Sequence, residues 1–170
     1  MDIVETYLGM GHFFIEDKAY DLAINALNKA TELSPDFAEA FCTRGLCYYI
    51  QDKFDEAVCE INKAIKLKPD VAMYYANRGL AHSYQEKHLE ALADFDKAIS
   101  LGLNESFVYS HRGEVYAELG KFAQSEVDFN HAITLNFIET IFDDNKDEIP
   151  MDDGNYNEND DAGKKDQEET

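Results

Sequence analysis

The chain has 170 residues, a formal net charge of -20 and 45% hydrophobic residues, so we expect one domain with a sizeable core. The negative charge and the lack of a Lys/Arg stripe argue against binding to nucleic acid or to an anionic membrane surface. No apolar run approaches the roughly 18 residues that span a bilayer, and the first residues lack the basic region of a signal peptide.

A 34-residue repeat runs through the chain from its first residues. Glycines recur at this step, at Gly11, Gly45, Gly79 and Gly113. In the second copy, Phe41, Gly45 and Tyr48 share one helix face. A polar break at residues 51–53 precedes a second apolar stripe, and Pro69 ends the unit because proline cannot continue a helix. Each copy is therefore predicted to form two helices joined by a short turn.

Small residues are predicted where the two helices of a copy come close. Gly45 lies on the first helix and Ala57 on the second, and a larger side chain on either would hold the backbones apart. One hairpin cannot bury its apolar face alone, so we expect neighbouring hairpins to stack. The 34-residue step places the repeats at residues 4–37, 38–71, 72–105 and 106–139.

The matched columns resemble the tetratricopeptide repeat over residues 4–139. The second copy carries most of the pattern, with Phe41, Gly45, Tyr48, Ala57, Ile61, Ala64 and Pro69. The third and fourth copies depart from it, with Leu103 and Phe137 in place of proline. The resemblance implies an all-α protein: an α-solenoid of four antiparallel helix-turn-helix repeats in a right-handed superhelix. It also implies that the chain binds other proteins.

Two columns depart from the family together. The residue before each glycine is usually Leu in the family, but here it is Met10, Arg44, Arg78 and Arg112. Sixteen residues later stand Ala26, Glu60, Asp94 and Asp128. A carboxylate within reach compensates a buried guanidinium, so we predict an ion pair inside each of the last three hairpins. The alternative is an arginine ladder that grips an acidic partner, although unpaired charges are rarely buried.

The resemblance also implies that the first helices form a concave inner wall that binds a partner. Carried over by position, the candidate groove residues are Thr43, Leu46, Tyr49, Ile50, Met73, Asn77, Leu80, Tyr84, Phe107 and His111. The middle of this wall is apolar, which favours a partner site. Asn77 matches a position where relatives often hydrogen-bond a peptide backbone. In the alternative interpretation, several of these side chains only pack against adjacent hairpins.

One subtype of the family binds the carboxyl-terminal tail of heat-shock chaperones through a clamp of Lys, Asn and Arg side chains on two carboxylates. At the corresponding positions this chain has Leu8, His12, Thr43, Met73 and Asn77. None of them matches the clamp. We therefore predict that the chain does not bind such a tail through this clamp.

The end of the array has its own pattern. Phe137, Ile138, Ile141 and Phe142 repeat at helical spacing, which predicts a short capping helix over residues 137–147, with its end within residues 140–149. The alternative is an apolar end that recruits a second copy. Residues 150–170 are mostly acidic and polar, so we predict a disordered acidic tail. The tail could serve solubility, attract a basic partner or shield the groove.

No sequence motif supports catalysis, a cofactor or a metal site. The three cysteines, Cys42, Cys47 and Cys59, form no even disulfide framework, which predicts free buried thiols in a reducing compartment and a cytoplasmic protein. We therefore predict a non-enzymatic interaction module, an adaptor or assembly factor that binds a peptide or helix of another protein. It is expected to be monomeric or weakly self-associating. The alternatives are a holding chaperone for an aggregation-prone client and a self-associating structural solenoid.

Overall fold

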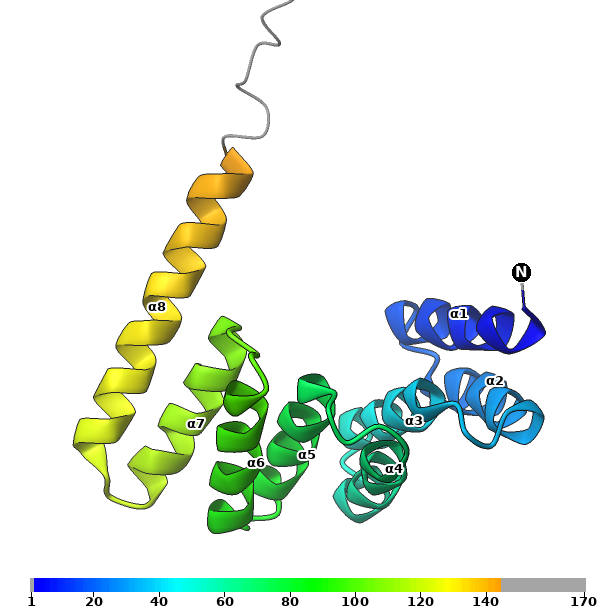
Figure 1. The fold of residues 1–170 in the computed structure, drawn as a ribbon, viewed down its shortest axis with the longest axis horizontal. Coiled ribbons are helices and arrows are strands. Elements are labelled where there is room, and N and C mark those ends of the chain that lie inside the picture. The colour runs from blue at the N-terminus through cyan, green and yellow to red at the C-terminus, as the bar shows by residue number, and fades with distance from the viewer. Residues whose placement is uncertain (1, 145–170) are drawn as a thin grey trace, which may run out of the picture.

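The computed structural model describes residues 2–144, which form eight α-helices and no strand. In chain order the helices are α1 (Ile3–Glu16), α2 (Tyr20–Leu33), α3 (Ala38–Ile50), α4 (Phe54–Leu67), α5 (Ala72–Tyr84), α6 (His88–Ser100), α7 (Ser106–Glu118) and α8 (Phe122–Asp144). Consecutive helices pair into four hairpins, which stack in chain order into a curved solenoid (Figure 1). The predicted α-solenoid of helical hairpins is confirmed.

The turn inside each hairpin uses a left-handed backbone residue at the same repeat position. These residues are Lys18, Asp52 and Glu86, with φ of 59°, 59° and 58°, and Gly120, with φ of 71°. The amide after this residue bonds back to the helix, as when Lys53 N donates to Tyr48 O at 2.9 Å, which satisfies a carbonyl of the last helical turn. Only Gly120 adopts this conformation without a steric cost.

The recurrent glycines lie where the two helices of a hairpin cross. A Cβ atom on Gly45 would lie 2.7 Å from Ile61 Cγ1 and 3.1 Å from the carbonyl oxygen of Ala57. One on Gly79 would lie 2.9 Å from the Phe95 ring. The predicted close approach of the two backbones is confirmed, and it explains why these helices tolerate glycine despite its low helix propensity.

The core follows the seams of the solenoid. Leu27, Ile61 and Phe95 occupy one repeat position on successive second helices, and each is fully buried. Each packs over the glycine of its own hairpin. Val108 and Val115 of α7 close the core between the third and fourth hairpins. Burying each such side chain contributes about 1.5–3 kcal/mol, so the stacked hairpins depend on one another.

The predicted cap differs from the structure. Residues 137–144 are helical, but they continue α8 without a break instead of forming a separate helix. The earlier second helices end next to Pro35, Pro69 or Gly102, which has φ of 94°, and α8 has no such residue at the equivalent place. Phe137 and Ile138 are 65% and 45% exposed, so a large part of each side chain stays uncovered. Residues 145–149 and the predicted tail at 150–170 lie outside the described residues.

The prediction of three buried thiols is correct for Cys42 and Cys47 and wrong for Cys59, which is exposed on α4.

Candidate functional site

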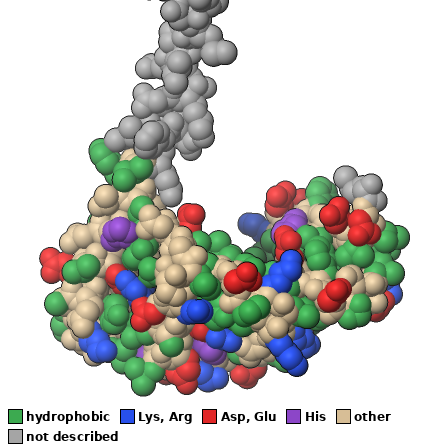
Figure 2. Space-filling model, in the orientation of Figure 1, with side chains coloured by type: hydrophobic (Ala, Val, Ile, Leu, Met, Phe, Trp, Pro, Cys, Tyr) green, Lys and Arg blue, Asp and Glu red, His purple; other side chains and the backbone are tan. Residues whose placement is uncertain are grey.

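The first helices of the four hairpins form the inner face of the solenoid. α1 contacts α3, α3 contacts α5, and α5 contacts α7, whereas no two second helices touch within residues 2–144. Helices on the inside of a curve converge and those on the outside spread, so α1, α3, α5 and α7 line the concave side. The space-filling view shows the hollow between α7–α8 and α1, with hydrophobic side chains on its floor, acidic ones on both sides and a basic one at the edge nearer α1 (Figure 2).

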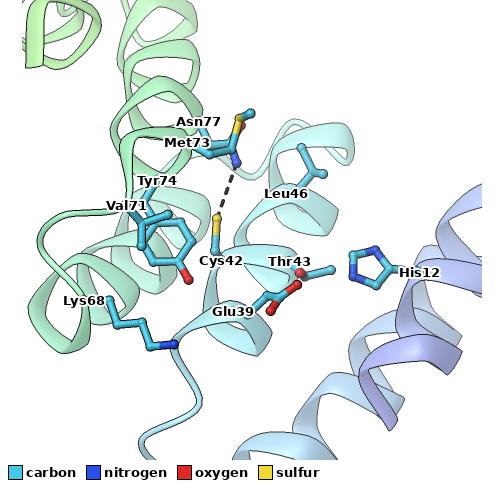
Figure 3. A pocket seen from close by; sticks show the side chains of 10 residues that line it. All are labelled: His12, Glu39, Cys42, Thr43, Leu46, Lys68, Val71, Met73, Tyr74 and Asn77. Atoms are coloured by element: carbon cyan, nitrogen blue, oxygen red, sulfur yellow. Dashed lines mark hydrogen bonds between the residues drawn. The ribbon is translucent and has the colours of Figure 1, made fainter. Parts of the chain in front are cut away.

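A pocket of about 450 Å³ opens on this face between α1, α3 and α5 (Figure 3). It is lined by His12, Glu39, Cys42, Thr43, Leu46, Lys68, Val71, Met73, Tyr74 and Asn77. Four predicted groove residues therefore share one pocket: Thr43, Leu46, Met73 and Asn77. Thr43 is buried and offers little surface, whereas Met73 is exposed at the mouth.

Asn77 is held in place by the neighbouring hairpin. Its Nδ2 donates to the Sγ of Cys42 at 3.4 Å (Figure 3). Burial raises the pKa of the Cys42 thiol to about 11, so this sulfur stays protonated and unreactive at neutral pH. One bond fixes the amide and leaves its carbonyl oxygen for a further hydrogen bond. Asn77 can therefore present an acceptor toward a peptide backbone.

An aromatic cluster continues the wall beyond this pocket. The rings of Tyr49 and Tyr84 meet edge to face at 5.5 Å, and Phe54 stacks on Tyr84 at 5.4 Å. Burial raises the pKa of the Tyr49 hydroxyl, which keeps it neutral. Tyr84 is 56% exposed and presents its ring to solvent. Phe54, which begins α4, was absent from the predicted groove. Tyr20 occupies the same repeat position, and this recurrent aromatic residue could have indicated Phe54.

The other predicted groove residues lie apart from the pocket. Leu80 is nearly buried in the core cluster and Phe107 packs against that cluster, so both have mainly structural contacts. Ile50 is exposed at the end of α3. The Nδ1 atom of His111 lies 2.9 Å from Glu114 Oε2 on α7.

The three predicted ion pairs are confirmed. Arg112 binds both carboxylate oxygens of Asp128 at 2.7 Å, and Arg78 binds those of Asp94 at 2.9 and 2.6 Å. Arg44 pairs with Glu60 through two nitrogens. Each carboxylate is buried, so the two hydrogen bonds from its arginine compensate the cost of removing both charges from water.

Each arginine also reaches back to the preceding hairpin. The third nitrogen of each guanidinium, Nη1, donates a hydrogen bond to the second helix of that hairpin. Arg44 donates to Asn28 at 2.7 Å, Arg78 to Asn62 at 2.6 Å and Arg112 to Asp96 at 2.6 Å. These acceptors occupy one repeat position on the second helices. The arginines therefore have structural partners on both sides and lie between the hairpins, which leaves the groove to other side chains.

Neither a metal site nor a membrane-spanning helix is found among residues 2–144. No three His, Cys, Asp or Glu side chains of that part of the chain are placed to hold a metal ion. Its helices are also too short or too polar for any of them to cross a bilayer.

Family comparisons match most of the chain. A TPR repeat model matches residues 11–52, and a tetratricopeptide repeat model matches residues 38–71, 72–101 and 108–138. Comparison with curated proteins found no significant match.

Solved structures share the fold. A crystal structure of MamA is 25% identical, with a TM-score of 0.72 over 81% of each chain. MamA 41-end from Desulfovibrio magneticus RS-1 is 19% identical, with a TM-score of 0.71 over 80% of this chain and 77% of that one. The first TPR of Spaghetti (RPAP3), bound to the HSP90 peptide SRMEEVD, is 22% identical, with a TM-score of 0.66 over 69% of this chain and 93% of that one.

Proposed function

Because the chain belongs to the tetratricopeptide repeat family, we propose that its concave surface binds a peptide or helix segment of a partner protein. Repeats of this family are typically interaction modules without catalytic activity. The adaptor or assembly role follows from the same surface, since a curved wall of four first helices holds an extended ligand along its length.

The observation that carries this proposal is the uncovered apolar surface in the middle of the wall. Met73 is exposed at the mouth of the pocket and Leu46 is half-buried in its lining. Tyr84 presents an exposed ring further along α5, where it lines a second hollow. Covering a side chain of this size removes apolar area from water and contributes about 1–2 kcal/mol. A partner segment that covers all three gains enough to overcome part of its ordering entropy.

Asn77 supplies the polar contact in this apolar setting. Its amide is anchored by Cys42 and its carbonyl oxygen remains as an acceptor. A backbone N–H of a bound segment satisfies that acceptor, and such a bond sets the position of the segment along the groove.

The partner we propose differs from the HSP90 peptide bound to the RPAP3 repeat, whose sequence SRMEEVD has three carboxylate side chains near its end. At the positions of the two-carboxylate clamp this chain has Leu8, His12, Thr43, Met73 and Asn77. None of these side chains carries a permanent positive charge, so a carboxylate-rich tail lacks a counter-charge here.

Affinity capture with the intact chain as bait tests the proposal. The Met73→Ala/Tyr84→Ala variant removes apolar surface from the concave side, and we expect it to lose partners that the wild type retains. The matched control is Leu33→Ala/Leu89→Ala, which removes two exposed side chains from the second helices. Quantitative mass spectrometry of the captured proteins measures the loss, and circular dichroism checks that both variants are folded. Equal capture by the wild type and the groove variant contradicts the proposal.

Self-association is a second candidate function, because both ends of the described solenoid expose large apolar side chains. Ile3 and Phe13 are exposed on α1, and Phe122 and Ile133 on α8. Cys47, which occupies the repeat position of Phe13 one hairpin later, is buried against the preceding hairpin. Light scattering over a range of concentrations tests this function: a mass that stays monomeric throughout contradicts it.

A further inference from the structure

The free charge on the concave wall is negative. The four first helices, within the described residues, contain no lysine and three arginines. Each of those arginines is held between two hairpins by a carboxylate of its own hairpin. The acidic side chains of the same helices are exposed; they are Glu5, Glu16, Glu39, Glu114 and Glu118. These four helices therefore offer a ligand exposed carboxylates and no lysine.

These carboxylates stand beside the apolar surface that the proposed function uses. Glu39 lines the pocket between α1, α3 and α5, where it lies with Leu46 and Met73. Figure 3 shows Glu39 on the side of the pocket that faces α1. Lys68, at the opposite side of the same pocket, is its one basic lining residue apart from His12.

A second hollow, of about 320 Å³, lies further along the wall between α5 and α7. It is lined by Ser83, Tyr84, Glu86, Glu114 and Glu118. The side chains of Glu114 and Glu118 are more than half exposed, and each has a histidine Nδ1 within 3.1 Å.

We propose that the segment bound on the concave wall is basic and amphipathic, with apolar side chains for the pocket and Lys or Arg side chains for the second hollow. This inference rests on the proposed function and adds the chemistry of the partner. An Arg or Lys side chain over the exposed ring of Tyr84 meets its negative π-face as well as the carboxylates around it. Complementary charge also attracts such a segment at a distance, and the net charge of -20 strengthens that attraction.

Selection from a random twelve-residue peptide library on the immobilised full chain tests this inference without assuming a sequence. We expect the enriched peptides to carry a net positive charge together with apolar residues. Raising the salt concentration is expected to weaken them, since exposed charges are screened. Enrichment of neutral or acidic peptides overturns the inference.

Two triple variants distinguish binding to the carboxylates of the concave wall from general electrostatic attraction to an acidic protein. Glu39→Gln/Glu114→Gln/Glu118→Gln removes three charges from the wall. We expect it to bind an enriched peptide about five- to tenfold more weakly, because each exposed ion pair with the peptide contributes modestly to the affinity. The control, Glu56→Gln/Glu90→Gln/Glu126→Gln, removes three exposed charges from the second helices. Equal weakening by both variants overturns the inference.

The Met73→Ala/Tyr84→Ala variant distinguishes failure of the inference from failure of the proposed function. Enriched peptides that are neutral or acidic but lose affinity for this variant overturn the basic partner and leave the groove in place. Enriched peptides that bind it as tightly as the wild type overturn both. Fluorescence anisotropy with the labelled peptide measures each affinity.

Discussion

The first hairpin and the three that follow share one backbone but differ at the position before the glycine. Met10 is 41% exposed, and Ala26 stands at the repeat position of its partner, whereas Arg44 is 9% exposed and pairs with Glu60. The arginine bonds inside its own hairpin and also to Asn28 of the hairpin before it. Met10 faces no preceding hairpin among the described residues.

This difference teaches that the arginine connects neighbouring hairpins as much as it connects the two helices of its own hairpin. A guanidinium has five N–H donors, and the interior positions use three nitrogens on two neighbours. Within residues 2–144 no hairpin precedes Met10, so an arginine there would leave part of its guanidinium to water. An apolar side chain at this position avoids that cost.

The largest effect on the difference between the first and the later hairpins is expected from removing a buried carboxylate. We expect Asp94→Ala to destabilise the fold by about 2–4 kcal/mol, because Arg78 and His82 lose their shared partner and a charge is left partly buried. Urea unfolding followed by circular dichroism measures the loss. Affinity for an enriched peptide is expected to stay unchanged in the folded variant.

The double variant Arg78→Met/Asp94→Ala serves as the control, because it gives the third hairpin the side chains of the first. Removing both partners leaves no uncompensated charge, so the double variant is expected to be more stable than Asp94→Ala alone. A double variant less stable than the single one would contradict the seam interpretation.

The second prediction concerns the helix crossing that all hairpins share. We expect Gly45→Ala to cost about 1–2 kcal/mol, because the new methyl group meets Ile61 and the Ala57 carbonyl while the helix gains propensity. Gly9→Ala on α1 is the matched control, since nothing lies within 4 Å of its added Cβ. It is expected to be neutral or stabilising, by up to about 1 kcal/mol. Thermal unfolding of the two variants provides the measurement.

The third prediction uses pH. Burial alone would raise the pKa of Asp94, but hydrogen bonds from Arg78 and His82 outweigh it and hold the pKa below its usual value of 3.8. A lowered folded-state pKa stabilises the fold above the unfolded value, and this contribution is lost as the pH falls through the folded value. The difference in unfolding free energy between the wild type and Asp94→Ala should therefore shrink below about pH 3.8. A difference that is constant from pH 7 to pH 3 contradicts the pairing.

The smallest effect on stability is expected from giving the first hairpin the Arg–Asp pair of the later hairpins. Met10→Arg/Ala26→Asp places a guanidinium at a position with much more solvent exposure and only one neighbouring hairpin. We expect a change in stability within about 1 kcal/mol, as for exposed ion pairs. A gain as large as the loss in Asp94→Ala would show that the pair needs no second hairpin.

Much of the architecture followed from recurrent residues. The glycine step predicted the helix pairs, and the joint change at Arg78 and Asp94 predicted the ion pairs, because two columns that change together report a contact. The bond from Arg78 to Asn62 was missed, although Asn62 recurs at the same step as Asn28 and Asp96. The cap was also misjudged, since apolar spacing at Phe137 indicates a helix but not where that helix begins.

The candidate surface was less predictable than the fold. Position in the repeat places a residue on a first helix, but the exposure of its side chain depends on the neighbouring hairpin. Leu80 and Tyr84 are four residues apart on α5, yet one is in the core and the other is open to solvent. Phe54 joins the wall from a second helix because its ring stacks on Tyr84.

Periodicity alone was enough to specify the helices, their pairing and the contact of Gly45 with the facing helix, because these are local consequences of a repeated pattern of small and large side chains. Only the stacked structure decided which side chains stay uncovered, that Glu39, Glu114 and Glu118 lie beside apolar surface, and that residues 137–144 continue α8. Those properties depend on the curvature that accumulates from one hairpin to the next, and curvature arises from all the seams together.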